Sequence, residues 1–327
     1  MTMQALWLEN RQLTYQRFLP IPSPEPGEAL IRLRLAGICS TDLEMLKGYY
    51  EFTGIPGHEF VGEIVQLPAG DEENRFQIGQ RVVGEINIVC GHCHTCLAGR
   101  PTHCENRRTL GLKGHHGAFA EYLTLPLQNL HVVPDSLSDE AAVFTEPLAA
   151  ALEIQEQVSV QPGAKTLLIG AGRLGQLIAQ SLALTGCDLK VVIRHQHQGE
   201  LLEARHISTL QAEKIQPAGY DLVIDATGSP AGLEMARRAV RPRGTILLKS
   251  TFKGNSQIDF SSLVVDEITI IGSRCGPFEP ALRLLDSKWV DPLPLMDHCF
   301  SLHDWKSAIE RASLPGAMKI VLDPSET

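Results

Sequence analysis

The stretch "CGHCHTCLAGRPTHC" at 90–104 carries cysteines in the spacing Cys-x2-Cys-x2-Cys-x7-Cys. Four thiolates this close can surround one Zn²⁺ tetrahedrally, and such a closed site leaves no open position for water or substrate. The stretch therefore predicts a structural zinc site whose metal binding is coupled to folding of the loop. An iron–sulfur cluster, which also uses four thiolates, is the alternative, although the spacing differs from that of ferredoxins. The predicted ligands are Cys90, Cys93, Cys96 and Cys104.

A glycine-rich turn, "GAGRLG", follows the apolar stretch "TLLIG" and precedes the helical stretch "LGQLIAQSLAL". In a dinucleotide-binding turn, Gly170 would permit the tight turn, Gly172 would let the backbone approach a pyrophosphate, and Gly175 would allow helix and strand to pack closely. The helix N-terminus, with Arg173 and Leu174, would offer free N–H groups to the phosphates. An ordinary turn between strand and helix is the alternative, but the strands that follow favour dinucleotide binding.

The end of the next strand indicates which nicotinamide cofactor is used. An NAD site has an acidic residue there, about 20 residues after the glycines, which holds the ribose 2′-hydroxyl. Here the expected strand "LKVVIR" ends on Arg194 and is followed by His195, whereas Asp188 precedes the strand. A guanidinium can pair with a 2′-phosphate, so we expect NADP(H) to be favoured over NAD(H). The alternative is that Arg194 is a solvated residue and that NAD(H) is used less selectively.

Two kinds of element must position these motifs. Residues 1–145 are rich in Gly, Pro and short alternating runs such as "EALIRLRLAGIC" (28–39), which predicts a β-rich domain. After a helical stretch at 146–158, apolar strands alternate with helical segments. This alternation predicts an α/β fold with a doubly wound parallel sheet covered by helices on both faces. A helix is expected at 303–312 and a final strand at 318–323.

The bulk composition excludes several classes of protein. The chain has 327 residues, of which 43% are hydrophobic, and a formal net charge of −9. This length suits two domains. No basic patch is visible, so no nucleic-acid partner is expected, and no run approaches the roughly 18 apolar residues of a membrane span. The N-terminal stretch lacks a secretory pattern, and cysteines outside the cluster are scattered, so we expect a reducing, cytoplasmic location.

Two short stretches, "GICSTD" (37–42) and "GIPGHEFVGEI" (54–64), are weaker evidence of chemistry. By residue type alone, Cys39 could be a small core residue and His58 a hydrogen-bonded loop histidine. In order along the chain, however, these stretches, the cysteine cluster, "GAFAEY", "TEPLAAAL", "GAGRLG" and "DATGS" resemble the zinc-containing alcohol dehydrogenases of the medium-chain dehydrogenase/reductase superfamily. The motif "EPLA" is most similar to the corresponding motif in the branch of polyol, glucose and threonine dehydrogenases.

The resemblance implies both a fold and a reaction. The fold would combine a GroES-like β-rich catalytic domain, formed by residues 1–147 and 279–327, with a Rossmann cofactor domain formed by residues 148–278. The reaction would be zinc-dependent hydride transfer between an alcohol or polyol, or its carbonyl counterpart, and a nicotinamide cofactor. The small substrate would lie in the cleft between the domains. Relatives are dimers or tetramers, which implies a homo-oligomer.

A second zinc ion, with a catalytic role, is also implied by the resemblance. Its ligands would be Cys39, His58 and Glu146, a set of sulfur, nitrogen and oxygen donors that suits zinc. Water, a substrate oxygen or Glu59 would take the fourth position, although we expect Glu59 to lie beside the ligands rather than among them. Glu146 could instead be a carboxylate favoured by a helix N-terminus.

The same resemblance assigns roles to residues around this zinc ion. Asp42 would orient His58 and fix its tautomer. Thr41 would pass on the proton of the substrate alcohol, and Thr227, in "DATGS", would contact the cofactor. Liver-type alcohol dehydrogenases carry a relay histidine two residues after the position of Asp42, where this chain has Glu44. Any proton relay to bulk water is therefore expected to be different or shorter.

Two other functions remain open from the sequence. Quinone and enoyl reductases of the same superfamily share the fold but lack both zinc sites, so the candidate ligands argue against them. A non-catalytic NADP(H)-binding or redox-sensing protein could also keep the fold. Metal analysis would separate these alternatives, because the dehydrogenase should hold two zinc ions per chain.

Overall fold

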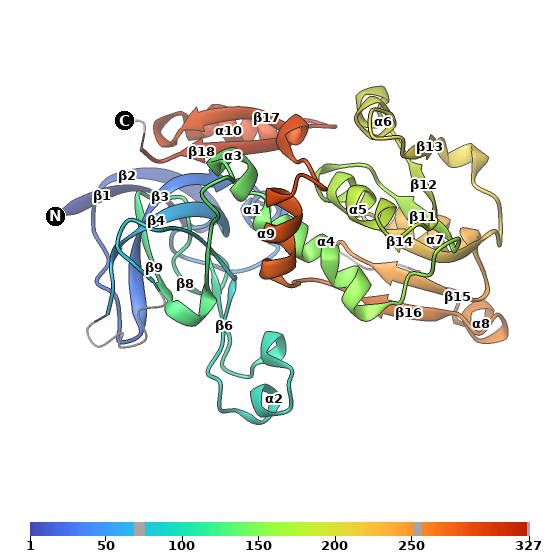
Figure 1. The fold of residues 1–327 in the computed structure, drawn as a ribbon, viewed down its shortest axis with the longest axis horizontal. Coiled ribbons are helices and arrows are strands. Elements are labelled where there is room, and N and C mark those ends of the chain that lie inside the picture. Colours follow the sequence, from blue (N-terminus) through green and yellow to red (C-terminus); the bar gives the residue numbers. More distant parts are fainter. Residues whose placement is uncertain (69–75, 252–254, 256, 326–327) are drawn as a thin grey trace. The chain divides into compact units, whose positions relative to one another are not determined.

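The computed structural model of the chain describes residues 1–68, 76–251, 255 and 257–325. It divides into two compact units (Figure 1). The first unit comprises Met1–Glu146 and Phe278–Thr327, and the second comprises Pro147–Pro277. The chain thus leaves the first unit after Glu146 and returns to it at Phe278. No helix within the described ranges is both long and apolar enough to cross a membrane.

The main sheet of the first unit has seven strands in the order β10-β5-β4-β3-β18-β17, with β9 also paired to β3. Separate from it are the two-stranded sheet β1-β2 and the small sheet β6-β7-β8. The strands are β1 Thr2–Glu9, β2 Gln12–Pro20, β3 Glu28–Gly37, β4 Glu59–Gln66, β5 Arg81–Gly84, β6 Asn87–Ile88, β7 Arg108–Leu110, β8 Gly114–His115, β9 Tyr122–Pro126, β10 Leu130–Val132, β17 Met296–Ser301 and β18 Lys319–Asp323.

The C-terminal strand completes this sheet. β18 runs antiparallel to β3, with Leu322 opposite Ala36, and parallel to β17. Its residues Ile320, Val321 and Leu322 are fully buried, as expected of a strand inside a sheet with both faces covered. β18 therefore lies beside the strand that precedes Cys39, and this pairing brings a side chain of β18 to the candidate site described below.

Short helices fill the connections of the first unit. Among the described residues, five helices lie wholly within it, of which α10 packs on β17 and β18, and a sixth, α4, begins there and continues into the second unit. The helices are α1 Ser40–Leu46, α2 His94–Leu97, α3 Asp139–Ala142, α4 Thr145–Gln157, α9 Phe278–Asp286 and α10 Trp305–Ala312, with 3₁₀ turns η1 Pro101–His103, η2 Leu127–Asn129, η4 Leu293–Leu295 and η5 Leu302–Asp304.

The second unit is a parallel six-stranded sheet in the order β13-β12-β11-β14-β15-β16, which is the predicted doubly wound α/β fold. Its core includes the fully buried Leu167, Val223 and Ile246. The strands are β11 Lys165–Ile169, β12 Asp188–Val192, β13 Ser208–Leu210, β14 Tyr220–Asp225, β15 Val240–Leu248 and β16 Thr269–Gly272. The helices are α5 Arg173–Ala183, α6 Gln196–Glu203, α7 Pro230–Ala239 and α8 Phe260–Val265, with the 3₁₀ turn η3 Ala212–Lys214.

One predicted strand end is wrong. The strand expected to end on Arg194 ends at Val192, and Asp188 is its first residue rather than the residue before it. The chain must turn after Val192 because His195 caps the next helix, α6, in an extended conformation. Arg194 consequently lies in the turn between β12 and α6, still at the carboxyl end of the sheet, whereas Asp188 lies at the opposite end.

Candidate functional site

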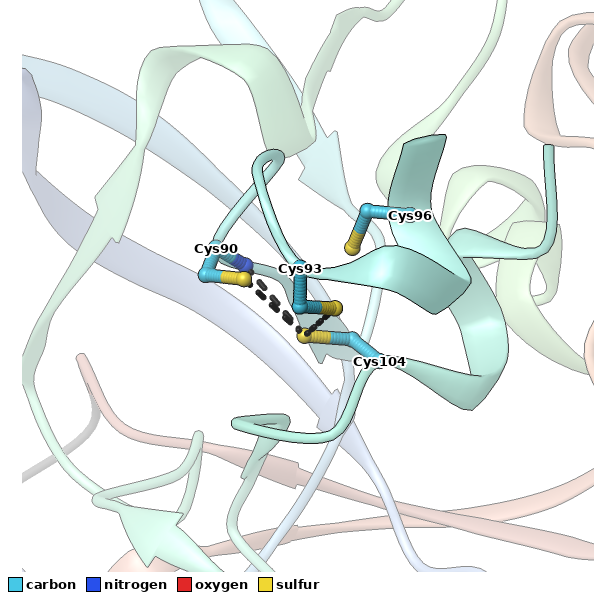
Figure 2. A group of neighbouring side chains, drawn as sticks. All are labelled: Cys90, Cys93, Cys96 and Cys104. Carbon is cyan, nitrogen blue, oxygen red and sulfur yellow. Dashed lines mark hydrogen bonds between the residues drawn. The ribbon is translucent and has the colours of Figure 1, made fainter. Parts of the chain in front are cut away.

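The four cysteines of the 90–104 loop converge on one point. Figure 2 shows their side chains turned toward one another, and their sulfur atoms all lie within 4.8 Å of one another. Cys104 Sγ is 3.5 Å from Cys90 Sγ and 3.8 Å from Cys93 Sγ. A tetrahedron of thiolates about 2.3 Å from zinc has edges of about 3.8 Å, so these separations fit a zinc cage.

Apolar packing contributes little to the stability of this loop. α2 and η1 are too short to be stable helices in isolation. In Figure 1, α2 lies near the end of a loop that extends from β6. Cys104 is the one buried thiol of the four, and Leu97 is 76% exposed, so apolar packing around the cluster is sparse. A metal ion bound by four thiolates would supply the crosslink that this loop lacks.

The cysteine thiols differ in acidity. Hydrogen bonds from the backbone N–H groups of His92 and Cys93 to its sulfur lower the pKa of Cys90 to about 6. Burial and the neighbouring thiols of Cys93 and Cys104 raise the pKa of Cys96 to about 12. At neutral pH the metal-free loop therefore holds a thiolate at Cys90 and a protonated thiol at Cys96, so zinc must displace at least one proton.

A second group of donors forms where β3 and β4 meet. Cys39 Sγ, a ring nitrogen of His58 and a carboxylate oxygen of Glu59 lie within 4.8 Å of one another. The sheet explains this, because Gly37 pairs with Glu59, and Cys39 and His58 lie just beyond that pair. His58 and Glu59 are buried at 3% and 1% exposure, while Cys39 is half-buried. Within the described ranges, this group and the cysteine cluster are the candidate metal sites.

Asp42 connects two members of this group. Its Oδ2 accepts a 2.8 Å hydrogen bond from the backbone N–H of Cys39, which caps helix α1. Its Oδ1 lies 3.4 Å from His58 Nδ1, and neither of these buried atoms has a hydrogen-bond partner among the residues that the structure describes. Orphaned buried polar atoms are costly. A metal on the other ring nitrogen would leave Nδ1 to donate to Asp42, so the pair fits the predicted orienting role.

The electrostatics of the group favour a bound cation. Burial lowers the pKa of His58, but Asp42 and Cys39 outweigh it and raise that pKa well above its usual value. The Thr41 hydroxyl lies 3.6 Å from Cys39 Sγ, and the Thr41 backbone N–H donates to the same sulfur at 3.5 Å. The hydroxyl predicted to move the substrate proton is thus adjacent to the candidate ligands.

Lys319 is a site residue that sequence analysis missed. The side chains of Glu59 and Lys319 form a close ion pair, and both are at most 3% exposed. Gly37 leaves room for this carboxylate, because a Cβ at Gly37 would overlap a Glu59 oxygen. Lysines are rarely buried without a partner, so the lysine at the start of the buried strand "KIVLD" was the available signal. Glu59 is therefore held by Lys319 beside Cys39 and His58.

Glu146 is not brought into the compact group. It lies half-buried in the first turn of α4, and its carboxylate is not among the atoms within 4.8 Å of one another. The start of its helix is nevertheless close to the site, since Lys319 Nζ lies 5.9 Å from the ring of Phe144. The structure thus brings together Cys39, His58 and Glu59, and the role of Glu146 as a ligand stays a prediction.

The glycine-rich turn of the second unit has the geometry that the motif predicts. Gly170 adopts φ +105°, where a side chain is strained, and a Cβ at Gly175 would overlap the carbonyl oxygen of Gly170. Gly172 caps α5, and a Cβ built there would meet no described atom within 4 Å. The α5 N-terminus, with Arg173 and Leu174, is therefore open to an approaching phosphate. The turn fits a dinucleotide pyrophosphate.

The other predicted cofactor residues lie at the same carboxyl edge of the parallel sheet. Arg194 is exposed, and its backbone N–H and that of His195 donate to the Gln198 side chain. Thr227 follows β14 and donates its hydroxyl to Asp225 Oδ1 at 2.8 Å. Burial raises the pKa of Asp225, although hydrogen bonds from Thr227 lower it. The Thr227 hydroxyl is thus already engaged within the chain.

The chain is similar to known dehydrogenases over almost its whole length. Residues 25–135 match the family model described as alcohol dehydrogenase GroES-like domain, and residues 174–287 match that described as zinc-binding dehydrogenase. An L-threonine 3-dehydrogenase of Chelativorans sp. is 30% identical, covering 98% of this chain and 96% of its own. A sorbitol dehydrogenase of Halalkalibacterium halodurans is 28% identical, covering 93% and 94%.

A solved structure confirms the fold. A zinc-binding dehydrogenase from Sinorhizobium meliloti 1021, bound to NADP, superimposes with a TM-score of 0.90 at 26% identity. The match covers 99% of this chain and 100% of that one. The predicted combination of a GroES-like domain with a Rossmann domain is therefore correct.

Proposed function

Since the chain belongs to the zinc-type alcohol dehydrogenases of the medium-chain dehydrogenase/reductase superfamily, we propose that it interconverts an alcohol or polyol and its carbonyl counterpart with zinc and NADP(H). As a member of this family it is an oxidoreductase. The polyol class is supported by the similarity to sorbitol dehydrogenase. The observation that carries the proposal is the convergence of Cys39, His58 and Glu59 beside Asp42, in a chain that also holds the dinucleotide turn.

The residues of the first unit would divide the work at the catalytic metal. A zinc ion held by Cys39, His58 and Glu146 would supply Lewis-acid chemistry to a substrate oxygen. Asp42, whose Oδ1 lies 3.4 Å from Nδ1, would keep the His58 ring in one orientation once a metal binds the other ring nitrogen. The Thr41 hydroxyl, next to Cys39, would accept the proton that the substrate alcohol loses. Glu59, paired with Lys319, would add a negative charge beside the ligands.

The proposal is tested by metal content and activity together. Metal-replete wild type should contain two zinc ions per chain and should reduce NADP⁺ with at least one member of a panel of primary alcohols and polyols. Glu146→Ala should lose one zinc ion and about 10³-fold in kcat/KM, because Lewis-acid stabilisation is worth several kcal/mol. If Glu146→Ala kept both its zinc and its activity, Glu146 would not be a ligand. If wild type bound no zinc, the zinc-dependent reaction would be wrong.

The preference for NADP(H) is proposed from Arg194 and the position of Asp188. Arg194 is exposed at the carboxyl end of β12, where it can reach a 2′-phosphate, whereas Asp188 begins the strand at the other end. We expect Arg194→Ala to lower kcat/KM for NADPH by about tenfold and to leave that for NADH nearly unchanged. Steady-state kinetics with both cofactors measure this. A wild type that prefers NADH would contradict the assignment.

A further inference from the structure

Lys249 is a buried lysine that the proposed reaction does not use. It follows β15 directly and is 7% exposed. Its Nζ donates to Ser273 Oγ at 3.0 Å and to the carbonyl oxygen of Arg274 at 2.6 Å, both just beyond β16. Removing an ammonium group from water costs several kcal/mol unless partners compensate, so a lysine kept here calls for an explanation.

A carboxylate on the neighbouring helix partly balances this charge. Burial raises the pKa of Glu153, on α4, while attraction to Lys249 lowers it. The segment after β16 packs on the same helix, because a Cβ at Gly276 would overlap the carbonyl oxygen of Ala149. Lys249 and the half-buried Glu153 thus carry opposite charges within electrostatic range of each other.

The position of Lys249 in the sheet connects it to the cofactor. In doubly wound sheets the dinucleotide lies outside the carboxyl ends of the strands, across the point where the strand order reverses. The half formed by β11, β12 and β13 carries the glycine-rich turn and Arg194, which would face the pyrophosphate and the adenosine of a bound dinucleotide. The half formed by β14, β15 and β16 would then face the nicotinamide. The Lys249 backbone N–H donates to the Asp225 carbonyl at 2.9 Å, so Lys249 lies at the carboxyl edge of this second half.

The nicotinamide ring changes charge in the reaction, which gives a nearby ammonium group a role. The oxidised ring is a cation, and accepting a hydride makes it neutral. A fixed positive charge repels the oxidised ring and leaves the reduced ring almost unaffected, and such a difference in interaction is what shifts relative affinities. We propose that Lys249 is a specificity-determining residue that weakens binding of the oxidised cofactor relative to the reduced one, and that Glu153 moderates this bias. The inference rests on the proposed nicotinamide cofactor.

The test is the ratio of the Kd for NADP⁺ to the Kd for NADPH, measured on the zinc-replete protein by fluorescence titration and calorimetry. In Lys249→Met we expect this ratio to fall about threefold to tenfold, because the repulsion between the Lys249 ammonium group and the oxidised nicotinamide ring is removed and NADP⁺ binds more tightly. In Glu153→Gln we expect it to rise, because the lysine loses its counter-charge. Lys165→Met is the matched control, as Lys165 is exposed at the opposite, amino end of the same sheet, and its ratio should stay unchanged.

The outcomes separate this inference from the proposed function. A purely structural role for Lys249 would weaken both redox forms alike and leave the ratio unchanged, and opposite shifts in the two variants have no such explanation. If Lys249→Met unfolds because Ser273 and Arg274 lose their donor, Glu153→Gln still decides the matter. If the wild type binds the cofactor normally but neither variant changes the ratio of Kd values, this inference is wrong and the proposed function is unaffected. If the wild type bound neither NADPH nor NADH, both the proposed function and this inference would be wrong. If the wild type preferred NADH, the test would use the ratio of the Kd for NAD⁺ to the Kd for NADH in place of the ratio for NADP⁺ and NADPH.

Discussion

The two groups of metal donors in the first unit are built in different ways. The cysteine cluster takes its donors from one loop of 15 residues, and every donor is a thiolate (Figure 2). The other group takes Cys39 and His58 from the ends of two paired strands, and Lys319 of a third strand holds Glu59. A closed cage of four thiolates would stabilise a weakly packed loop, whereas a zinc ion with three protein ligands in a buried core would keep a position for substrate.

The largest expected difference between the groups is in catalysis. We expect Cys39→Ser to lower kcat/KM by about 10³-fold or more, because it disrupts the proposed Lewis-acid site, which is worth several kcal/mol. Its thermal unfolding should remain close to that of wild type, since α1 keeps the Asp42 cap on the residue-39 backbone. Steady-state kinetics and thermal unfolding measure the two effects. Nearly full activity in Cys39→Ser would remove the catalytic role of this group.

A smaller loss is expected at Thr41. Thr41→Ala removes the hydroxyl next to Cys39 and should lower kcat about 10²-fold, the usual size of a general acid–base contribution, without loss of zinc. Thr41→Ser keeps the hydroxyl and serves as the control, and it should recover most of the rate. An equal loss in both variants would mean that the threonine methyl group, rather than the hydroxyl, matters.

The acidity of the thiols predicts a pH dependence for the cysteine cluster. The raised pKa of Cys96, about 12, means that zinc releases its proton throughout the neutral range, so affinity should rise with pH, about tenfold per unit for each proton released. Below pH 6 the Cys90 proton must also be released, because the pKa of Cys90 is about 6, and the slope should steepen. Competition with a chromophoric chelator, on a Cys39→Ser background, measures this. A pH-independent affinity would rule out the thiolate cage.

The sequence predicted what depends on local spacing and missed what depends on distant pairing. The cysteine cluster and the glycine-rich turn are each confined to one short segment, and their geometry follows from it. The burial of Lys319 at the site could not be predicted from the sequence, because its partner, Glu59, is 260 residues away in the chain. The strand end expected at Arg194 was two residues too late, because an apolar run does not show where a helix cap begins.

Lys249 illustrates a further limit. A single lysine after an apolar strand is normally exposed, and nothing in "GTILLKS" shows that Ser273 and the Arg274 carbonyl will enclose its ammonium group. Such burial follows from the pairing of β15 with β16 and from the packing of α4, both of which are tertiary. Residues of this kind can be found only after the sheet has been assembled.

The most direct test of the division between the two groups is to measure zinc content and the apparent Tm in Cys39→Ser and Cys96→Ser side by side. We predict that each variant loses one of two zinc ions. The Tm should fall by about 5 °C or more in Cys96→Ser alone, as expected for a loss of roughly 2 kcal/mol. A Cys96→Ser protein with wild-type Tm but no activity, or a Cys39→Ser protein that is unstable yet active, would contradict the account.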